Sequence, residues 1–426
     1  MVRVITRSYH EVEYCGTELE QTLGKFGLQR KLFSLHFTLM LTTMSMHFSK
    51  ATKYTLLAGA LISALLACGG GGSAADTSAT TSTTSTGTTT GTSTTTGTST
   101  TTGTTSTGCS ASLASAARLV CLANAFKATL SSADQATLQY TMNKTDAVRW
   151  SNLPASMSAR NGVKFGNLSA ASLAAAQALL QAALGAQGES SRATFLLADD
   201  VLGTVQSNGY GSANYYLAFI GTPSETTPWI LQFTGHHYTS HITMNGAALS
   251  PTPMFIAIEP QTFTVGTTAY EPMGAHRTAV YDLLGALDAN QQLAAKLTGT
   301  YTDLVVTPGK DGQFPTTRAG FLASNLTVGQ QAKLKTAMEA WVKNVDSSMS
   351  DALIAEYTSA SALADTYIGW TGSVSSTPPQ NAYFRIDGPK VWIEFSAQRG
   401  IIYPSQIHFH SIWRDKARDY GGQFAF

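Results

Sequence analysis

Charged residues are scarce in this chain. Asp, Glu, Lys and Arg make up 12% of its 426 residues, and the formal net charge is +1. A nearly neutral chain lacks the basic patch with which proteins bind nucleic acid, so we expect no nucleic-acid partner. The P-loop, the G-x-G-x-x-G dinucleotide fingerprint and the G-x-S-x-G nucleophile elbow are also missing. The sequence therefore gives no support to nucleotide-dependent or serine-based catalysis.

A long apolar run is missing as well. The apolar segment 54–67 has about 14 residues, whereas a membrane-spanning helix needs roughly 20. It follows Lys50 and Lys53 and ends in L-L-A-C, a lipobox pattern, with glycines directly after Cys68. We interpret 46–67 as a lipoprotein signal peptide, with lipidation at Cys68 as the membrane anchor. An ordinary signal peptide and a short anchor helix are the alternatives.

This interpretation places the chain in the bacterial cell envelope, as an outer-membrane lipoprotein that faces the periplasm or the exterior. Residues 1–45 precede the charged start of the signal peptide, and we interpret them as a gene-model extension, with the start at Met44 or Met46. Residues 73–107 are almost only Ser, Thr, Gly and Ala, with too little apolar surface to offset the entropy of folding. We expect 68–108 to be a disordered tether.

Cysteine is rare too. Of four cysteines, only Cys109 and Cys121 lie in the remaining segment, 109–426. A cysteine pair outside the cytoplasm favours a disulfide, and two free buried thiols are the alternative. One straight helix from Cys109 to Cys121 would hold them about 18 Å apart. We therefore predict a disulfide, with a turn between the two cysteines.

Segment 109–426 is long enough for one large domain with a sizeable core. Stretches rich in Ala, Leu and Gln with helical spacing alternate with stretches rich in aromatic and β-branched residues. Their order predicts a single α+β domain, with a mixed, mostly antiparallel sheet and helices packed on it. The predicted helices are 112–128, 132–142, 170–185, 275–285, 289–297, 328–345 and 347–365, and the predicted strands are 215–220, 229–244, 248–258, 383–386, 391–395 and 406–413.

Four predicted helix starts resemble one another. They begin at Leu130, Leu168, Leu287 and Leu326, and each leucine is followed by Ser, Asp or Thr, which can cap the first turn. Their spacing along the chain is uneven. We therefore interpret the similarity as recurrent capping chemistry and not as a solenoid.

Histidine is concentrated in two short stretches, 235–241 and 408–410, and only His276 of segment 109–426 lies elsewhere. Side chains alternate between the two faces of a strand. His408 and His410 are therefore expected on one face, with Phe409 on the other, and His237 is expected to share a face with His241. If the two stretches form neighbouring strands, three or four imidazoles surround one point.

Neutral imidazole binds Zn, Cu, Ni and Fe, and three histidines that leave one coordination position open suit Lewis-acid catalysis. The nearby sequence has no cysteine, which excludes a cysteine-type structural zinc site. We predict a zinc or copper site formed by His236, His237, His408 and His410, although the adjacent His236 and His237 need not both be ligands. Catalytic histidines without a metal and structural core histidines are the alternatives.

Other polar residues are candidates for catalysis. Arg414 can clamp an anionic group with its planar fork, and Asp415 or Glu394 can act as a base or orient a histidine. We therefore predict Glu394, Arg414 and Asp415 as catalytic residues, with a structural Arg–Asp pair as the alternative. Glu259 and Glu271 are further candidate acids, and their alternative is a solvated carboxylate.

Several motifs resemble the domain-of-unknown-function family 3500, from about residue 115 to the end. They are R-W-S-N-L-P at 149–154, N-G at 161–162, G-T-P at 221–223, P-W at 228–229, G-H-H at 235–237, G-P-x-V-W-I-E-F at 388–395, H-x-H-x-x-W-R-D at 408–415 and D-Y-G at 419–421. The resemblance implies one single domain but no substrate. It also implies that an amide residue often stands at the place of His241. By motif match, the family-type positions are His236, His237, His408, His410, Arg414 and Asp415.

Together these features predict a cell-envelope enzyme, a metal-dependent hydrolase or oxidoreductase that acts on a small or oligomeric extracellular substrate. A non-catalytic surface lipoprotein that binds a metal or another ligand is the alternative. A structural envelope protein is a third possibility. The deciding geometry is whether the two histidine stretches converge.

Overall fold

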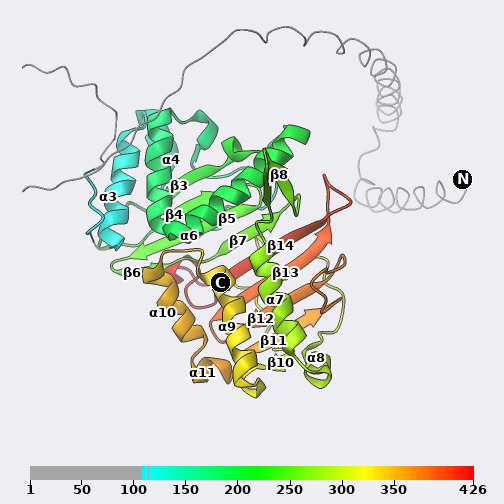
Figure 1. Ribbon diagram of the computed structural model, residues 1–426. Helices are drawn as coiled ribbons and strands as arrows, with labels where there is room; N and C mark the ends of the chain where they lie inside the picture. Colours follow the sequence, from blue (N-terminus) through cyan, green and yellow to red (C-terminus); the bar gives the residue numbers. More distant parts are fainter. Residues whose placement is uncertain (1–107, 114) are drawn as a thin grey trace, which may run out of the picture. The chain divides into compact units, whose positions relative to one another are not determined.

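The stretches rich in aromatic and β-branched residues form one large sheet (Figure 1). This computed structural model describes residues 108–113 and 115–426, so the predicted signal peptide, Cys68 and nearly all of the tether lie outside the described residues. The sheet order is β1-β3-β4-β5-β7-β14-β13-β12-β11-β10, with β2 on β3 and β6 on β5. The strands are β1 (Gln139–Tyr140), β2 (Val163–Lys164), β3 (Tyr216–Ile220), β4 (Trp229–Thr234), β5 (Tyr238–Asn245), β6 (Ala248–Ser250), β7 (Met254–Ile258), β10 (Phe321–Leu322), β11 (Tyr367–Thr371), β12 (Tyr383–Asp387), β13 (Val391–Arg399) and β14 (Ile407–Asp415), and a separate hairpin joins β8 (Phe263–Val265) to β9 (Thr268–Tyr270).

All neighbouring strands of the large sheet are antiparallel except β1 and β3, which are parallel. The predicted α+β class with a mixed, mostly antiparallel sheet is therefore confirmed. The helices are α3 (Ser115–Ala128), α4 (Ser132–Leu138), α5 (Lys144–Ala147), α6 (Ala170–Val205), α7 (Gly274–Ala286), α8 (Ala289–Ala295), α9 (Val328–Val342), α10 (Ser347–Tyr357) and α11 (Ala360–Leu363).

The predicted helix starts are confirmed, because Ser131, Ser169, Asp288 and Thr327 each accept a hydrogen bond from a first-turn amide. The predicted end of helix 170–185 coincides with a break in α6, but the helix that follows the break was not predicted. Gly185 breaks the helix with a φ of 69°, and a second helical segment continues to Val205. That second segment carries part of the site described below.

The two faces of the sheet differ in chemistry. One face is apolar and packs against the helices, which cross the front of the sheet in Figure 1. Trp413, Phe409, Ile256 and Ile393 are among its buried residues. The other face carries the polar residues of the strands, and irregular segments that contain Trp150 and 304–306 cover it. Because side chains alternate along each strand, one sheet supplies both a core and a polar layer.

The chain contains an internal repeat. The order β3-β4-β5-β7 meets β14-β13-β12-β11 in reverse at the antiparallel pair β7–β14, so a pseudo-twofold axis passes between these two strands. Each half begins with a capped helix, α4 or α8. A two-residue strand, β2 or β10, and a longer capped helix, α6 or α9, then follow.

Matching backbone hydrogen bonds show that the halves correspond residue by residue. Ala257 N donates to His237 O at 2.8 Å, and Lys416 N donates to Lys390 O at 2.7 Å. Gly235 N likewise donates to Tyr238 O, as Gly388 N does to Val391 O. The four similar helix starts are therefore two copies of one pair. The two starts of a pair are 38 residues apart in the first half (168 − 130) and 39 in the second (326 − 287), so the interpretation as capping chemistry alone was incomplete.

The predicted disulfide between Cys109 and Cys121 is confirmed, with their Cα atoms 5.7 Å apart. Cys109 precedes a turn and Cys121 lies within α3, as the helix-length argument required. Among the described residues, we find no helix with the length and apolar character needed to cross a bilayer.

Replacing both Cys109 and Cys121 with Ser should lower the free energy of unfolding by up to about 3 kcal/mol, because the closed loop restricts the unfolded chain. Urea unfolding of the oxidised wild type and of the double variant measures this difference. Equal midpoints for the two proteins would contradict the expectation.

Candidate metal centre

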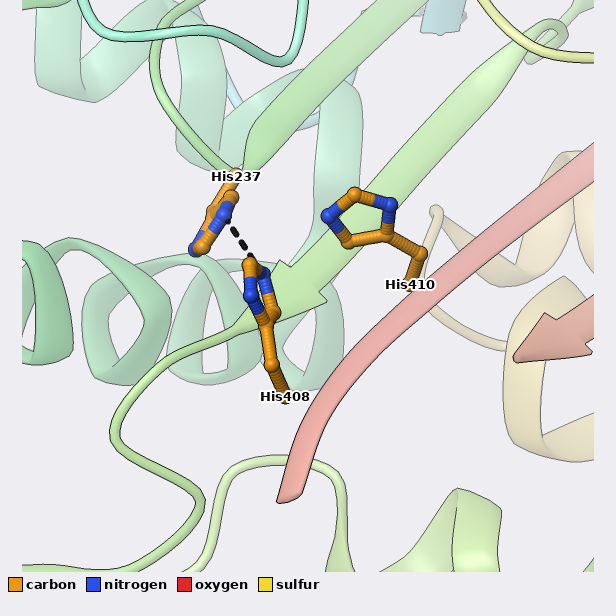
Figure 2. Close-up of side chains that lie close together, drawn as sticks. All are labelled: His237, His408 and His410. Carbon is orange, nitrogen blue, oxygen red and sulfur yellow. Dashed lines mark hydrogen bonds between the residues drawn. The ribbon is translucent and has the colours of Figure 1, made fainter. Parts of the chain in front are cut away.

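Three histidines from distant parts of the chain converge: His237, His408 and His410. Each offers one ring nitrogen, and the three nitrogens lie within 4.8 Å of one another. His237 Nε2 and His408 Nε2 are 2.9 Å apart. All three residues are buried, with 4–5% of their surface exposed. Figure 2 shows the three rings gathered around a common space. The two histidine stretches therefore meet in one place.

His237 reaches this place from a turn and not from a strand. The predicted strand 229–244 is wrong at residues 235–237, where a turn separates β4 from β5. The φ of His237 is 63°, a left-handed value that no strand accepts. His237 and His241 consequently do not share a strand face. The turn requires glycine at 235, because a Cβ there would lie 2.2 Å from the Tyr215 ring.

His408 and His410 come from β14, on its polar face, while Phe409 packs into the apolar core as predicted. The two histidine stretches are not on neighbouring strands, because β7 lies between β5 and β14. The turn instead lies beside β7, at Ala257 near the C-terminal end of that strand. Ala257 of β7 donates to His237 O and is also the register partner of His410. One residue of β7 thus spaces the two histidine stretches.

Carboxylates lie behind two of the imidazoles. His410 Nδ1 is 2.9 Å from Asp303 Oδ1, and His408 Nδ1 is 3.4 Å from Glu259 Oε2. The other oxygen of Glu259 accepts from the backbone amides of Ile402 and Tyr403, at 2.6 and 2.7 Å. Asp303 is within hydrogen-bond distance of His410 Nδ1 and can leave Nε2 of that ring as the free acceptor, which is the usual arrangement behind a metal-binding histidine. Glu259 lies beside His408 Nδ1 without a hydrogen bond to it.

Two ring nitrogens of the cluster lack a hydrogen-bond partner, and one of them is His408 Nδ1, which lies beside Glu259. His410 Nε2 is buried and makes no hydrogen bond, while Nδ1 of the same ring faces both Asp303 and Gln398. Buried polar atoms are nearly always paired, so an unpaired acceptor among two other imidazoles needs a chemical reason. A bound cation would provide one.

His236 lies beside the three converging histidines, but its Nδ1 points elsewhere. That nitrogen is 2.5 Å from Asp199 Oδ1 on α6, and the second oxygen of Asp199 accepts from Gly211 N at 2.9 Å. The His236 ring stacks on the His237 ring, with centroids 3.5 Å apart. Tyr210 packs its ring against His236 with centroids 4.8 Å apart.

Burial and neighbouring rings favour the neutral form of His237 and His408. Desolvation, aided by His236, His408 and His410, holds the pKa of His237 well below its usual value. Desolvation and the same kind of repulsion lower the pKa of His408. Burial alone would raise the pKa of Asp303, but its contacts with His410 and the Leu304 amide outweigh burial and lower it. A neutral imidazole is the form that binds a metal.

The remaining histidines of the domain lie apart from this cluster. His241 Nδ1 is 3.0 Å from Pro253 O, and its Nε2 is 3.2 Å from Gln232 Nε2. His276 on α7 lies 3.4 Å from Asn344. Burial lowers the pKa of each of these two histidines to about 4. Both are neutral core residues near pH 7.

Glu394 lies at the centre of the polar face, where it is fully buried and accepts four hydrogen bonds. The donors are Trp392 Nε1, Tyr383 Oη and the backbone amides of residues 305 and 306, at 2.5 to 2.9 Å. It therefore anchors the segment that carries Asp303. It occupies the place in the second half that His241 occupies in the first, because it faces Arg385 as His241 faces Gln232.

Arg414 and Asp415 belong to a separate polar network. Arg414 Nη1 binds Asp311 and Asp419, at 3.0 and 2.8 Å, and Asp415 binds Tyr357 and Arg418. Arg414 lies on the same face of β14 as His410 but four residues further, which is about 13 Å along a strand. The catalytic roles of Glu394, Arg414 and Asp415 stay predictions, since no substrate contact is described.

Sequence reasoning missed Asp199 and Asp303, which lie on a helix and an irregular segment far from either histidine stretch. No local pattern marks them. Glu259 was one of two candidate acids before a proline, and it is buried beside His408. The other, Glu271, pairs with Arg277 at the surface.

The neutral buried histidines imply acid sensitivity. Between pH 6.5 and about 4 the unfolded chain binds protons at His241 and His276 that the folded chain does not, so stability should fall as the pH falls. Each histidine contributes up to about 1.4 kcal/mol per pH unit. His241→Gln should flatten the dependence of the unfolding free energy on pH, measured by urea unfolding with a chelator present. A slope identical to the wild type would refute this origin.

Glu394→Gln should lower the free energy of unfolding by about 2 kcal/mol, because an amide nitrogen would then face backbone donors in a buried place. Thermal and urea unfolding measure the loss. Glu271→Gln is the control, since Glu271 is 35% exposed and makes a surface ion pair. An unaltered midpoint for Glu394→Gln would contradict the anchoring role.

Comparison with known proteins places the whole described domain in one family. The sequence profile described as protein of unknown function (DUF3500) matches residues 112–422, which is most of the chain and includes every histidine of the cluster. A search of curated proteins found no match, and neither did a search of solved structures. The suspected family is therefore confirmed, and the chain is a member of the DUF3500 family.

Proposed function

We propose that His237, His408 and His410 bind one divalent metal ion, zinc or copper. The observation that carries this proposal is the convergence of three imidazole nitrogens within 4.8 Å in a buried place. A four-coordinate ion bound by three imidazoles keeps one position open. Small movements of the side chains would bring the three nitrogens to the spacing of such an ion.

The charge around the cluster supports a cation. Asp199, Glu259 and Asp303 are carboxylates that contact its histidines, and among the described residues none of the three forms an ion pair with Lys or Arg. The repeat offers a comparison. The amides of Ala257 and Lys416 occupy matching positions in the two halves. Two residues later, the first half has Glu259, whereas the second half has Arg418, which pairs with Glu356. A divalent ion would balance the negative charge of the carboxylates in the first half, whereas Arg418 balances the charge of Glu356 in the second half.

The same proposal extends to catalysis. A metal with an open position acts as a Lewis acid or activates water, and zinc and copper favour hydrolysis and electron transfer respectively. We propose a metal-dependent enzyme, a hydrolase or an oxidoreductase, for a small or oligomeric extracellular substrate. The chain would supply three imidazole ligands, orient His410 through Asp303, place Glu259 beside His408, and shield the ion from bulk water.

A second candidate is a non-catalytic metal-binding protein. The observation that favours it is the burial of the three histidines, which leaves only 4–5% of each residue exposed. A protein that holds an ion benefits from such burial, whereas an enzyme must also admit its substrate. Turnover separates the two candidates.

We also propose that the domain is presented outside the cytoplasm as a cell-envelope lipoprotein, anchored at Cys68 to the outer membrane. The disulfide between Cys109 and Cys121 supports this proposal, because such bonds persist in oxidising compartments. Labelling with a fatty acid that carries a clickable group tests it. Cys68→Ser should abolish the label and release the chain from membranes. A chain that remains unlabelled in the wild type would refute the anchor.

Metal analysis tests the central proposal. The full chain, purified without a His-tag and loaded with zinc or copper, should retain about one ion per chain after dialysis. His408→Ala and His410→Ala should lose that ion, because each removes one of three ligands. His276→Ala is the matched control and should retain it.

The outcomes are distinct. No retained ion in the wild type under either loading would end the metal proposal. Retention in the wild type, together with chelator-sensitive turnover of acyl, phosphoryl or phenolic test substrates, supports the enzyme. Retention without any turnover on these substrates favours the metal-binding protein.

A further inference from the structure

The turn that delivers His237 differs from its counterpart in the other half. Both turns keep the same two backbone hydrogen bonds, at Gly235 and Gly388 and at the carbonyls of His237 and Lys390. Yet the φ of His237 is 63°, whereas Lys390 is not among the non-glycine residues with positive φ in the described chain. The left-handed conformation is unfavourable for a residue with a Cβ. The shared hydrogen bonds do not explain why only the histidine turn adopts it.

The side chain of residue 236 differs between the two turns. His236 stands where the other half has Pro389, and it lies nearly parallel to the His237 ring, at 3.5 Å and with an interplanar angle of 27°. The edge of Tyr210 closes its other side. His236 thus contacts the strained residue directly over a whole ring face.

A fixed carboxylate holds His236 in turn. Asp199 is 1% exposed and uses both oxygens, one for His236 Nδ1 and one for the amide of Gly211. It projects from the second segment of α6, after the break at Gly185. An unbroken series of contacts therefore runs from α6 through Asp199 and His236 to the ring of His237.

The second half contains a related contact between a helix carboxylate and the turn, but no histidine takes part in it. Glu356 on α10, the helix that matches the second segment of α6, pairs with Lys390 of the opposite turn. Both halves thus join a helix carboxylate to the turn at the sheet. Only in the first half does the helix carboxylate contact an aromatic ring, His236, that stacks against a candidate metal ligand, His237.

We propose that Asp199 and His236 are positioning residues. They hold the backbone of His237 in its left-handed conformation, so that the imidazole of His237 faces His408 and His410 before a metal binds. This inference rests on the proposed metal site. His236 is not a fourth ligand, because it is not among the histidines whose ring nitrogens converge within 4.8 Å, and the ring-plane lone pairs of two stacked rings run side by side without converging. The contact between Asp199 and His236 preorganises the centre, as an outer hydrogen-bond partner does for a ligand histidine.

The test compares metal affinity in matched variants of the full chain. Asp199→Asn weakens that contact, His236→Phe keeps a stacked ring without the hydrogen bond, and His236→Ala removes both. Each should bind zinc about 10- to 100-fold more weakly in competition with a chromogenic chelator. His236→Ala should be the weakest of the three. Glu356→Gln removes the corresponding ion pair with Lys390 in the other half, and this variant should bind zinc as the wild type does.

The spectrum of the cobalt-loaded protein gives a second measurement. Positioning predicts the same visible bands and about one ion per chain in all variants that bind, since the ligand set is unchanged. Changed bands or lost stoichiometry in both His236 variants, with Asp199→Asn normal, would make His236 a ligand and overturn the proposal. Wild-type affinity in all three variants would also overturn it while leaving the metal site intact. A wild type that binds no ion fails the proposed function itself.

Discussion

The antiparallel pairing of β7 with β14 is the contact on which the rest of the structure depends. It joins the two halves of an internal repeat into one sheet and sets the register of His410 against Ala257. The same Ala257 holds the turn of His237 through its backbone amide. A shift of this register by one residue would turn His408 and His410 toward the apolar core and place Phe409 on the polar face. The histidine cluster is therefore a product of the junction and belongs to neither half alone.

The repeat shows how one backbone carries two different polar layers. At matching positions, His241 and Gln232 hold the segment before Trp150 in one half, and Glu394 holds residues 305 and 306 in the other. Both arrangements satisfy the backbone of a covering segment with a buried side chain, which an antiparallel sheet with two covered faces requires. The histidine cluster arose at only one of the two related ends. At that end, Glu259 occupies the position that Arg418 occupies in the second half, and His236 occupies the position of Pro389.

The sequence predicts the elements of this fold well, because helix caps and strand alternation act over a few residues. Ser169 and Thr327 cap helices as expected, and His408 and His410 share a face. The turn at residues 235–237 was not predicted, because β-rich sequence continues on both sides and the φ of His237 depends on tertiary contacts. Asp199 and Asp303 were not predicted either, because their proximity to the cluster arises from chain segments that pattern analysis does not relate. The convergence of the two histidine stretches was a hypothesis until the strand order was known.

The imidazole pair at the centre of the cluster joins residues 171 positions apart in the chain. Contacts of such long range form late, because the entropy of closing the loop must be overcome before they add any stability. In a newly made chain the two histidine stretches are therefore separate. The histidine cluster forms only when both halves have folded and docked. For the proposed metal site, the compartment in which this chain completes its folding would thus also be the compartment whose metal pool decides which ion it binds.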